Sequence, residues 1–277
     1  MLFTIIYALI ALGVDALIFI LTGLYNYPWF YWVPVIAFPV LYLLAFGVSL
    51  IFLFIASLFI DRKKEVTKPD VVARFFVTQI VHQLNYLSGS IVKKSNFNLI
   101  PHNEPYLIIY NHLSNFDPMF IMDFLHKDRI ICVTKPQNIE IPIAGPFIHK
   151  AGYIAIDREN AKEGTKAILK AVDFVNKGYG SIAIAPEGSR SKTGLLQEFH
   201  PGSFQIGYHA HIPIVLMGFK NTNLIHKNFM KRFTKIDMNV LAVYSYGEYK
   251  DIPSREFALQ AHKIYEDYLG ENAEETK

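Results

Sequence analysis

Two long apolar runs open the chain, and each has the length of a membrane helix. The first covers residues 2–24 and contains a single charged side chain, Asp15. The second ends at residue 60 and is best placed as a span at about 38–60. At about 1.5 Å per residue, either run can cross the hydrocarbon core of a bilayer. Aromatic residues suited to the membrane–water interface lie between the runs at Trp29, Tyr31 and Trp32.

The topology of these runs stays open at this point. A hairpin embedded in one leaflet fits as well as two spans, because the turn between the runs carries no charge. Asp15 is costly in mid-span unless it is paired or close to water, so it is either functional or part of the hairpin interface. A cleaved signal peptide is not expected, since no basic segment precedes the first run and a longer run follows it.

The pattern then changes to an amphipathic helix followed by alternating strands and helices. The helix is predicted at residues 70–91, and it suits either a core or a membrane surface. Its apolar positions are Val71, Phe75, Ile80, Leu84 and Leu87. Strands are expected at 106–110, 129–133, 153–156, 181–185, 212–217 and 238–244, and helices at 118–126, 162–176 and 255–269. This alternation predicts an α/β sheet with ligand-binding loops at the strand ends.

Composition supports a membrane segment joined to a globular domain. The residue types A, V, I, L, M, F, W, Y and C make up 48 of the first 60 residues, or 80%, against 52% of all 277. A wholly soluble domain and a disordered chain are therefore excluded. We expect a membrane hairpin at 1–60, a basic segment with the amphipathic helix at 61–95, and an α/β domain at 96–277.

The positive charge is concentrated directly after the apolar runs. The net charge of +3 divides into −1 for residues 1–60, +4 for 61–100 and zero for 101–277. A nucleic-acid-binding domain would spread Lys and Arg over its folded surface, so no nucleic-acid partner is expected. A basic cluster beside an apolar segment suits the anionic cytoplasmic leaflet, although a merely solubilising role is also compatible. The globular domain is therefore expected on the cytoplasmic side.

The first candidate for chemistry is His112, just past the predicted strand at 106–110. Asp117 and Pro118 have the chemistry of a helix cap followed by the first helical residue, and the turn between can bring Asp117 back onto His112. A carboxylate on one imidazole nitrogen fixes the tautomer and leaves the other nitrogen as a base. A structural histidine bonded within its own turn would explain the same spacing.

Two arginines follow other predicted strands. Arg158 comes after the strand at 153–156, and Arg190 lies in the polar turn after 181–185. Guanidinium groups suit phosphate oxygens, although each arginine alone also fits a surface ion pair. The single cysteine, Cys132, is expected to be a buried structural thiol.

The sequence contains no pattern that calls for a metal or a nucleotide cofactor. His209 and His211 alternate just before a strand, which is weak evidence for a metal, and no Cys/His pattern has zinc spacing. The glycine-rich loops that bind nucleotide phosphates are also absent from the sequence. No cofactor and no metal are therefore expected.

Taken in order, the sequence blocks after these strands resemble the lysophosphatidic acid acyltransferase family, the 1-acylglycerol-3-phosphate O-acyltransferases. The family's Asn-His-x4-Asp block stands at 111–117, and its Phe-Pro-Glu-Gly-Thr-Arg-Ser block at 185–191. Looser matches are the strand before Arg158 and the strand at 212–215, and the likeness covers roughly residues 90–220. Departures from the family pattern are Ala185 for Phe, Ser189 for Thr, His200 for Lys or Arg, and Leu216 for Pro.

The resemblance implies an acyltransferase-type mixed sheet flanked by helices, and a defined reaction. A fatty acyl group would pass from acyl-CoA or acyl-carrier protein to the sn-2 hydroxyl of lysophosphatidic acid, giving phosphatidic acid at a lipid membrane. His112 would be the general base and Asp117 would orient it. The acceptor would be bound by Arg158, Glu187, Gly188, Ser189 and Arg190. By their positions, the Gly188 N–H and Lys135 are candidates for stabilising the oxyanion.

Other functions remain compatible to different degrees. Another glycerol-phosphate or lysophospholipid acceptor fits the same motifs, because the motifs report acyl transfer better than acceptor identity. A membrane-anchored lipid-binding protein without catalysis is disfavoured by the intact residues His112, Asp117, Glu187 and Arg190. A serine hydrolase is disfavoured because the sequence has no Gly-x-Ser-x-Gly elbow.

Overall fold

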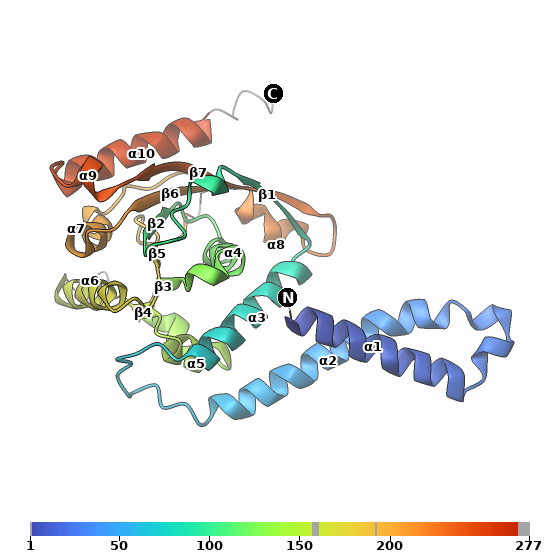
Figure 1. Cartoon of the computed structure of the whole chain (residues 1–277). Coiled ribbons are helices and arrows are strands. Elements are labelled where there is room, and N and C mark those ends of the chain that lie inside the picture. The colour runs from blue at the N-terminus through green and yellow to red at the C-terminus, as the bar shows by residue number, and fades with distance from the viewer. Residues whose placement is uncertain (1, 157–160, 192, 271–277) are drawn as a thin grey trace.

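Two apolar helices lead into a mixed β-sheet that is covered by helices on both faces (Figure 1). The computed structural model describes residues 2–156, 161–191 and 193–270. Among these residues the sheet has seven strands, in the order β1-β7-β6-β2-β5-β3-β4. The predicted α/β architecture with an N-terminal pair of apolar helices is confirmed.

The predicted strands and helices are present near their predicted positions, and the structure adds elements that were not predicted: β1, α5, α7, α8 and α9. The strands are β1 (Ser90–Ser95), β2 (Leu107–Tyr110), β3 (Ile131–Thr134), β4 (Ile154–Ala155), β5 (Ile182–Ile184), β6 (Ile214–Lys220) and β7 (Thr234–Tyr244). The helices are α1 (Leu2–Leu21), α2 (Val33–Ser57), α3 (Val71–Leu87), α4 (Phe116–Phe124), α5 (Ala144–Lys150), α6 (Ala161–Asn176), α7 (Gln205–Ala210), α8 (Ile225–Asn228), α9 (Tyr246–Tyr249) and α10 (Ser254–Gly270).

Helices α1 and α2 form the N-terminal hairpin. They pack through a small cluster around Tyr7, Ala11 and Tyr42, whereas most of their other apolar side chains are exposed. Both are long and apolar enough to cross a membrane. Asp15 is buried, and its spacing places it on the same helix face as Tyr7 and Ala11. This position favours a role in the hairpin interface.

Helix α2 begins earlier than predicted, at Val33 instead of about residue 38. The two prolines near the start of α2 do not prevent this earlier start. Pro34 occupies the second helical position, where a backbone N–H has no partner within the helix in any case. Pro39 lies inside the helix and removes one further hydrogen bond without ending it.

Helix α3 occupies most of the predicted range, but its buried face differs from the predicted one. Asp70 caps it by accepting a 2.8 Å hydrogen bond from the backbone N–H of Ala73. Ala73, Val77 and Val81 face the core, whereas Val71, one of the predicted apolar positions, is 76% exposed. Both faces of α3 carry apolar residues, so the apolar pattern alone does not predict which face packs against the core of the domain.

Polar side chains of α3 bind the hairpin to the globular domain. Gln79 Oε1 accepts a hydrogen bond from the backbone N–H of Phe3 at 3.1 Å. Gln83, which is fully buried, accepts through Oε1 from the hydroxyls of Thr4 at 3.1 Å and Tyr42 at 2.9 Å. The hairpin is therefore docked on α3 by directional bonds as well as by apolar contact.

The sheet brings the loops after several strands to a single edge. Strands β6, β2, β5, β3 and β4 run parallel to one another, whereas β7 pairs antiparallel with β6 and parallel with β1. Helices α6, α7 and α10 lie on one face, and α3, α4 and α5 on the other (Figure 1). Cys132 is buried in β3, where burial raises the pKa of its thiol to about 12, as expected of a structural cysteine.

Tyr265 of α10 ties two central strands together. Its buried hydroxyl lies 2.6 Å from the carbonyl oxygen of Ile109 in β2 and 3.1 Å from that of Met217 in β6. A single helix residue thus braces the sheet beside the carboxyl end of β2.

Replacing Tyr265 by Phe removes this hydroxyl and should lower the free energy of unfolding by about 1–3 kcal/mol, because buried carbonyl oxygens lose a donor. Thermal melting of the full chain in detergent should show a Tm several degrees lower. Tyr86→Phe, at an exposed position of α3, is the control and should leave Tm unchanged. Equal melting of both variants would contradict this role.

Candidate active site

His112 and Asp117 meet at the carboxyl end of β2. His112 Nδ1 lies 3.0 Å from Asp117 Oδ2. The same carboxylate oxygen accepts the backbone N–H groups of Leu113 at 2.7 Å and Ser114 at 2.6 Å. Asp117 is fully buried, and it lies in the first turn of α4 instead of at the predicted cap position, because the helix begins at Phe116, two residues before the predicted start at Pro118. One oxygen therefore shapes the turn and orients the imidazole.

The other imidazole nitrogen of His112 is available for chemistry. A carboxylate cannot donate, so the Nδ1 atom carries the proton and donates it to Asp117. Nε2 has no hydrogen-bond partner within the described part of the chain, and the side chain is 18% exposed. The Tyr110 ring lies edge-on at 5.9 Å and closes one side. Asp117 thus engages Nδ1 and leaves Nε2 as the ring nitrogen without a partner among the described residues.

Glu187 holds the backbone of His112 in place. Its Oε1 accepts the His112 backbone N–H at 2.7 Å, and its Oε2 accepts the backbone N–H of Gln197 at 3.1 Å and the side-chain amide of Gln197 at 3.3 Å. The residue is only 4% exposed. Burial raises the pKa of the Glu187 carboxyl, and these hydrogen bonds oppose the rise. Both carboxylate oxygens are therefore engaged within the protein.

The turn after β5 contacts His112 a second time. The backbone N–H of Ser191 donates to the carbonyl oxygen of His112 at 2.9 Å, so both backbone groups of His112 are bound from this turn. Gly188 has a φ of 78°, which favours glycine, and its N–H lies 3.4 Å from the carbonyl oxygen of Ala185. Ser189 Oγ donates to Gln197 Oε1 at 3.3 Å.

The remaining predicted site residues lie further out or cannot be placed. Arg190 is exposed in the same turn as Gly188 and Ser189. Lys135 is exposed at the end of β3, on the same edge of the sheet but two strands away from β2. Arg158 lies outside the described residues. Among the residues that are described, no group of three His, Cys, Asp or Glu side chains is arranged to hold a metal ion.

Asn111 and Gln197 have structural roles that the sequence did not reveal. The buried Asn111 side chain donates to the carbonyl oxygen of Phe219 at 3.0 Å and accepts the Phe219 N–H at 2.7 Å. It thereby extends the pairing of β2 with β6 to the residue next to His112. The only sequence signal for Asn111 was its place in the Asn-His-x4-Asp block, and Gln197 had none.

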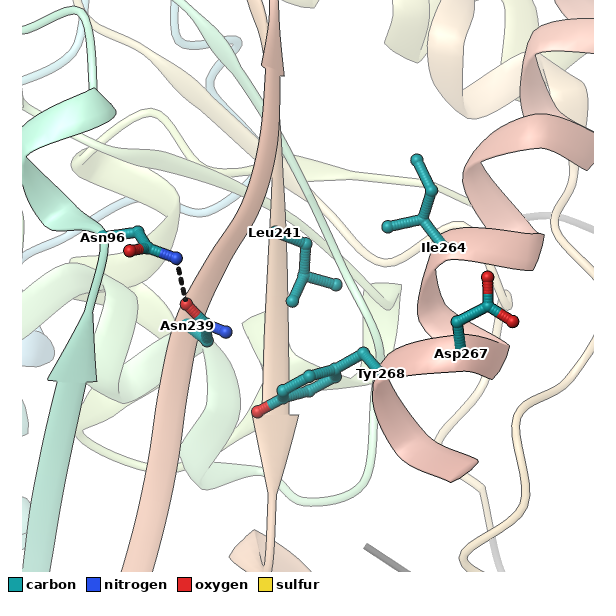
Figure 2. A pocket seen from close by; sticks show the side chains of 6 residues that line it. All are labelled: Asn96, Asn239, Leu241, Ile264, Asp267 and Tyr268. Carbon is teal, nitrogen blue, oxygen red and sulfur yellow. Dashed lines mark hydrogen bonds between the residues drawn. The ribbon is translucent and has the colours of Figure 1, made fainter. Parts of the chain in front are cut away.

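A groove on another part of the domain is separate from this pair. It lies between β7 and α10 (Figure 2). Its lining residues are Asn96, Asn239, Leu241, Ile264, Asp267 and Tyr268. Neither His112 nor Asp117 borders it, so the candidate site is assigned from the side-chain geometry at the strand ends.

Comparison with known proteins agrees with this geometry. Residues 91–220, which include the His112–Asp117 pair and the Glu187 turn, match the family model described as Acyltransferase. The matched stretch covers a little under half of the 277 residues. The solved structure of the 1-acyl-sn-glycerophosphate acyltransferase PlsC from Thermotoga maritima has the same fold, with a TM-score of 0.58 at 18% identity, over 79% of this chain and 86% of that one.

Two curated relatives have the same description. The 1-acyl-sn-glycerol-3-phosphate acyltransferase of Cocos nucifera is 29% identical over 168 residues, which are 60% of this chain and 54% of the relative. The protein of that name from Haemophilus influenzae is 26% identical over 171 residues, 61% of this chain and 70% of the relative. The chain thus spans about half the length of the plant relative.

Glu187→Gln tests whether this residue positions His112 or contacts a bound substrate. A Gln keeps one acceptor oxygen, so either the His112 or the Gln197 N–H loses its partner. The kcat of acyl transfer should fall by about tenfold to a hundredfold, with little change in the acceptor KM. Glu198→Gln, at an exposed neighbouring position, is the control. A rise in acceptor KM at unchanged kcat would instead indicate direct acceptor binding.

Proposed function

We propose that this protein transfers a fatty acyl group from an acyl thioester to the sn-2 hydroxyl of 1-acylglycerol-3-phosphate, giving phosphatidic acid. The observation that carries the proposal is the His112–Asp117 pair, with Nε2 unengaged among the described residues, inside the stretch that matches the Acyltransferase family model. The printed names of the relatives support the choice of acceptor. Acyl-CoA and acyl-carrier protein both suit as donors, because each presents the same thioester.

In the proposed reaction, Nε2 of His112 accepts the proton of the acceptor hydroxyl while the hydroxyl oxygen attacks the thioester carbonyl carbon. The new ester C–O bond forms, and the C–S bond breaks with its electron pair staying on sulfur. The imidazolium then returns the proton to the thiolate, which leaves as a free thiol. Asp117 keeps the ring oriented and stabilises the transient positive charge. This route needs no acyl-enzyme and no cofactor, and positioning of two substrates supplies much of the rate.

The acceptor phosphate is proposed to bind at the turn after β5. Arg190 is exposed there, and among the described residues no ion pair engages its guanidinium. A guanidinium presents paired donors that match phosphate oxygens, and the Gly188 amide and Ser189 hydroxyl can add donors from the same turn. Arg158, which lies outside the described residues, stays a proposed phosphate ligand, and Lys135 stays a proposed oxyanion donor. Glu187 is proposed to act on the acceptor only indirectly, through His112.

The α1–α2 hairpin is proposed to keep the domain at the cytoplasmic face of a membrane. Both helices have the length and apolarity of membrane spans, and the basic cluster directly follows α2. Lysophosphatidic acid and phosphatidic acid both reside in the bilayer, so the site must work at its surface. An anionic leaflet would attract the cluster by about 1 kcal/mol per basic residue.

His112→Ala should abolish the formation of phosphatidic acid, because the proton acceptor is lost. A positioned base contributes roughly 10²–10⁴-fold to the rate, and Asp117→Asn should cost a similar factor through misorientation of the ring. Membranes carrying each variant are incubated with lysophosphatidic acid and labelled acyl-CoA or acyl-carrier protein. His200→Ala, at an exposed position, is the matched control and should retain activity. Full activity of His112→Ala would remove His112 as the base.

Arg190→Gln should raise the KM for lysophosphatidic acid with a smaller effect on the KM for the acyl donor. The physical reason is that the phosphate loses a charge-assisted, two-pronged hydrogen bond. Arg255→Gln, exposed on α10, serves as control. The same assay run with glycerol-3-phosphate and with lysophospholipids that carry a head group identifies the acceptor. Preference for one of these over lysophosphatidic acid would overturn the proposed substrate.

A further inference from the structure

The connection between α8 and β7 exposes large apolar side chains among basic ones. We define residues 227–233 as the basic–apolar loop. Its apolar members Phe229, Met230 and Phe233 are 50%, 92% and 74% exposed. Its basic members Lys227, Lys231 and Arg232 are also exposed. Residues 225–236 contain four Lys or Arg and no Asp or Glu, within a region, 101–277, that is otherwise balanced in charge.

The loop is held in shape by one buried residue. Asn228 accepts through its carbonyl oxygen from the backbone N–H groups of Lys231 at 2.8 Å and Arg232 at 3.0 Å. Its side chain accepts from Arg232 Nε at 2.9 Å and donates to Thr234 Oγ1 at 3.0 Å. The apolar side chains are therefore presented outward by a bonded turn.

Met230 combines a left-handed backbone conformation with a large apolar side chain that is exposed. Its φ is 58°, in the left-handed region, where glycine or asparagine meets less steric cost. The side chain is nevertheless apolar and almost completely exposed. The turn therefore projects an apolar side chain away from the domain, and such a side chain is favoured where it meets an apolar surface.

The loop lies close to both the end of α3 and the turn that carries His112. The backbone N–H of Thr234 donates to the carbonyl oxygen of Gly89 at 3.1 Å, just after α3 ends. The His226 ring lies 6.0 Å from that of Phe116, the neighbour of Asp117. In Figure 1 the α8–β7 connection and the N-terminal hairpin both project to the right-hand side of the domain.

We propose that the basic–apolar loop is a second membrane contact of this protein, which seats Phe229, Met230 and Phe233 in the headgroup–acyl boundary of an anionic leaflet. Lys227, Lys231 and Arg232 would then face lipid phosphates. The loop and the hairpin are the two places where the domain meets the bilayer, with α3 between them. The uniform positive charge selects an anionic surface and opposes pairing with the same loop of a second copy. The inference rests on the membrane location in the proposed function, but on no step of the reaction.

A fluorescent label at Met230→Cys tests this contact in the full chain. Cys132 is buried, with the pKa of its thiol raised to about 12, so the introduced thiol is labelled selectively. The labelled protein is reconstituted into vesicles of phosphatidylcholine and phosphatidylglycerol in a roughly three-to-one ratio, and into phosphatidylcholine alone. Leu169→Cys, exposed on α6 at the opposite side of the domain in Figure 1, is the matched control.

In the mixed vesicles, lipid-borne doxyl quencher should reduce the emission at position 230 several-fold more than at position 169, and aqueous iodide should do the reverse. The difference should shrink in phosphatidylcholine alone and in Lys227→Gln/Lys231→Gln/Arg232→Gln. Equal accessibility of the two labels to iodide would overturn the proposal. Protection from iodide without doxyl quenching would also overturn it, because it would indicate burial against protein. Neither readout uses acyl transfer, so failure of the proposed reaction is distinguishable from failure of this contact.

Discussion

One carboxylate oxygen, Oδ2 of Asp117, fixes the geometry on which the candidate site depends. It accepts two backbone N–H groups of the turn after β2 and the Nδ1 proton of His112. The backbone bonds keep the turn closed, and the third bond sets the tautomer and direction of the ring. The second oxygen, Oδ1, is buried and has no hydrogen-bond partner among the described residues. All hydrogen bonds that stabilise the Asp117 carboxylate within the described part of the chain therefore reach Oδ2, the oxygen that faces the His112 ring.

A second buried carboxylate joins the two halves of the site across the sheet. His112 and Glu187 are far apart in sequence, but β2 and β5 pair in parallel, so the turns after them meet. Glu187 binds the N–H of His112, and Ser191 binds its carbonyl oxygen. Burial of Glu187 carries an electrostatic cost, visible in its raised pKa, which the bonds from His112 and Gln197 partly offset. A neutral side chain could not accept from both sides, which explains an acid at this buried position.

The sequence predicted what depends on local pattern and missed what depends on distant partners. The apolar runs gave α1 and α2, and the turn after β2 gave the His112–Asp117 contact, because the residues involved are close in the chain. Strand β1 was not predicted, and its first two residues were placed at the end of the preceding helix, since its pairing residues lie in β7, more than a hundred residues away. The inward direction of Glu187 was missed for the same reason. A Pro-Glu-Gly turn reads as polar and exposed until the partner turn at His112 is placed against it.

Polar side chains of helix α3 connect the α1–α2 hairpin to α4, the helix that follows the turn carrying His112. On one side it binds α1 and α2 through Gln83. On the other, His82 Nδ1 lies 2.7 Å from Asp123 Oδ1, and the Asn85 side chain donates to Asp123 Oδ2 at 3.1 Å and to the Met119 carbonyl oxygen at 3.2 Å. Asp123 and Met119 belong to α4, the helix that begins directly after the turn carrying His112. Apolar contacts alone would let two helices slide, whereas buried hydrogen bonds fix one relative position because any shift leaves polar groups unpaired. These directional bonds thus fix the position of the hairpin relative to the turn that carries His112.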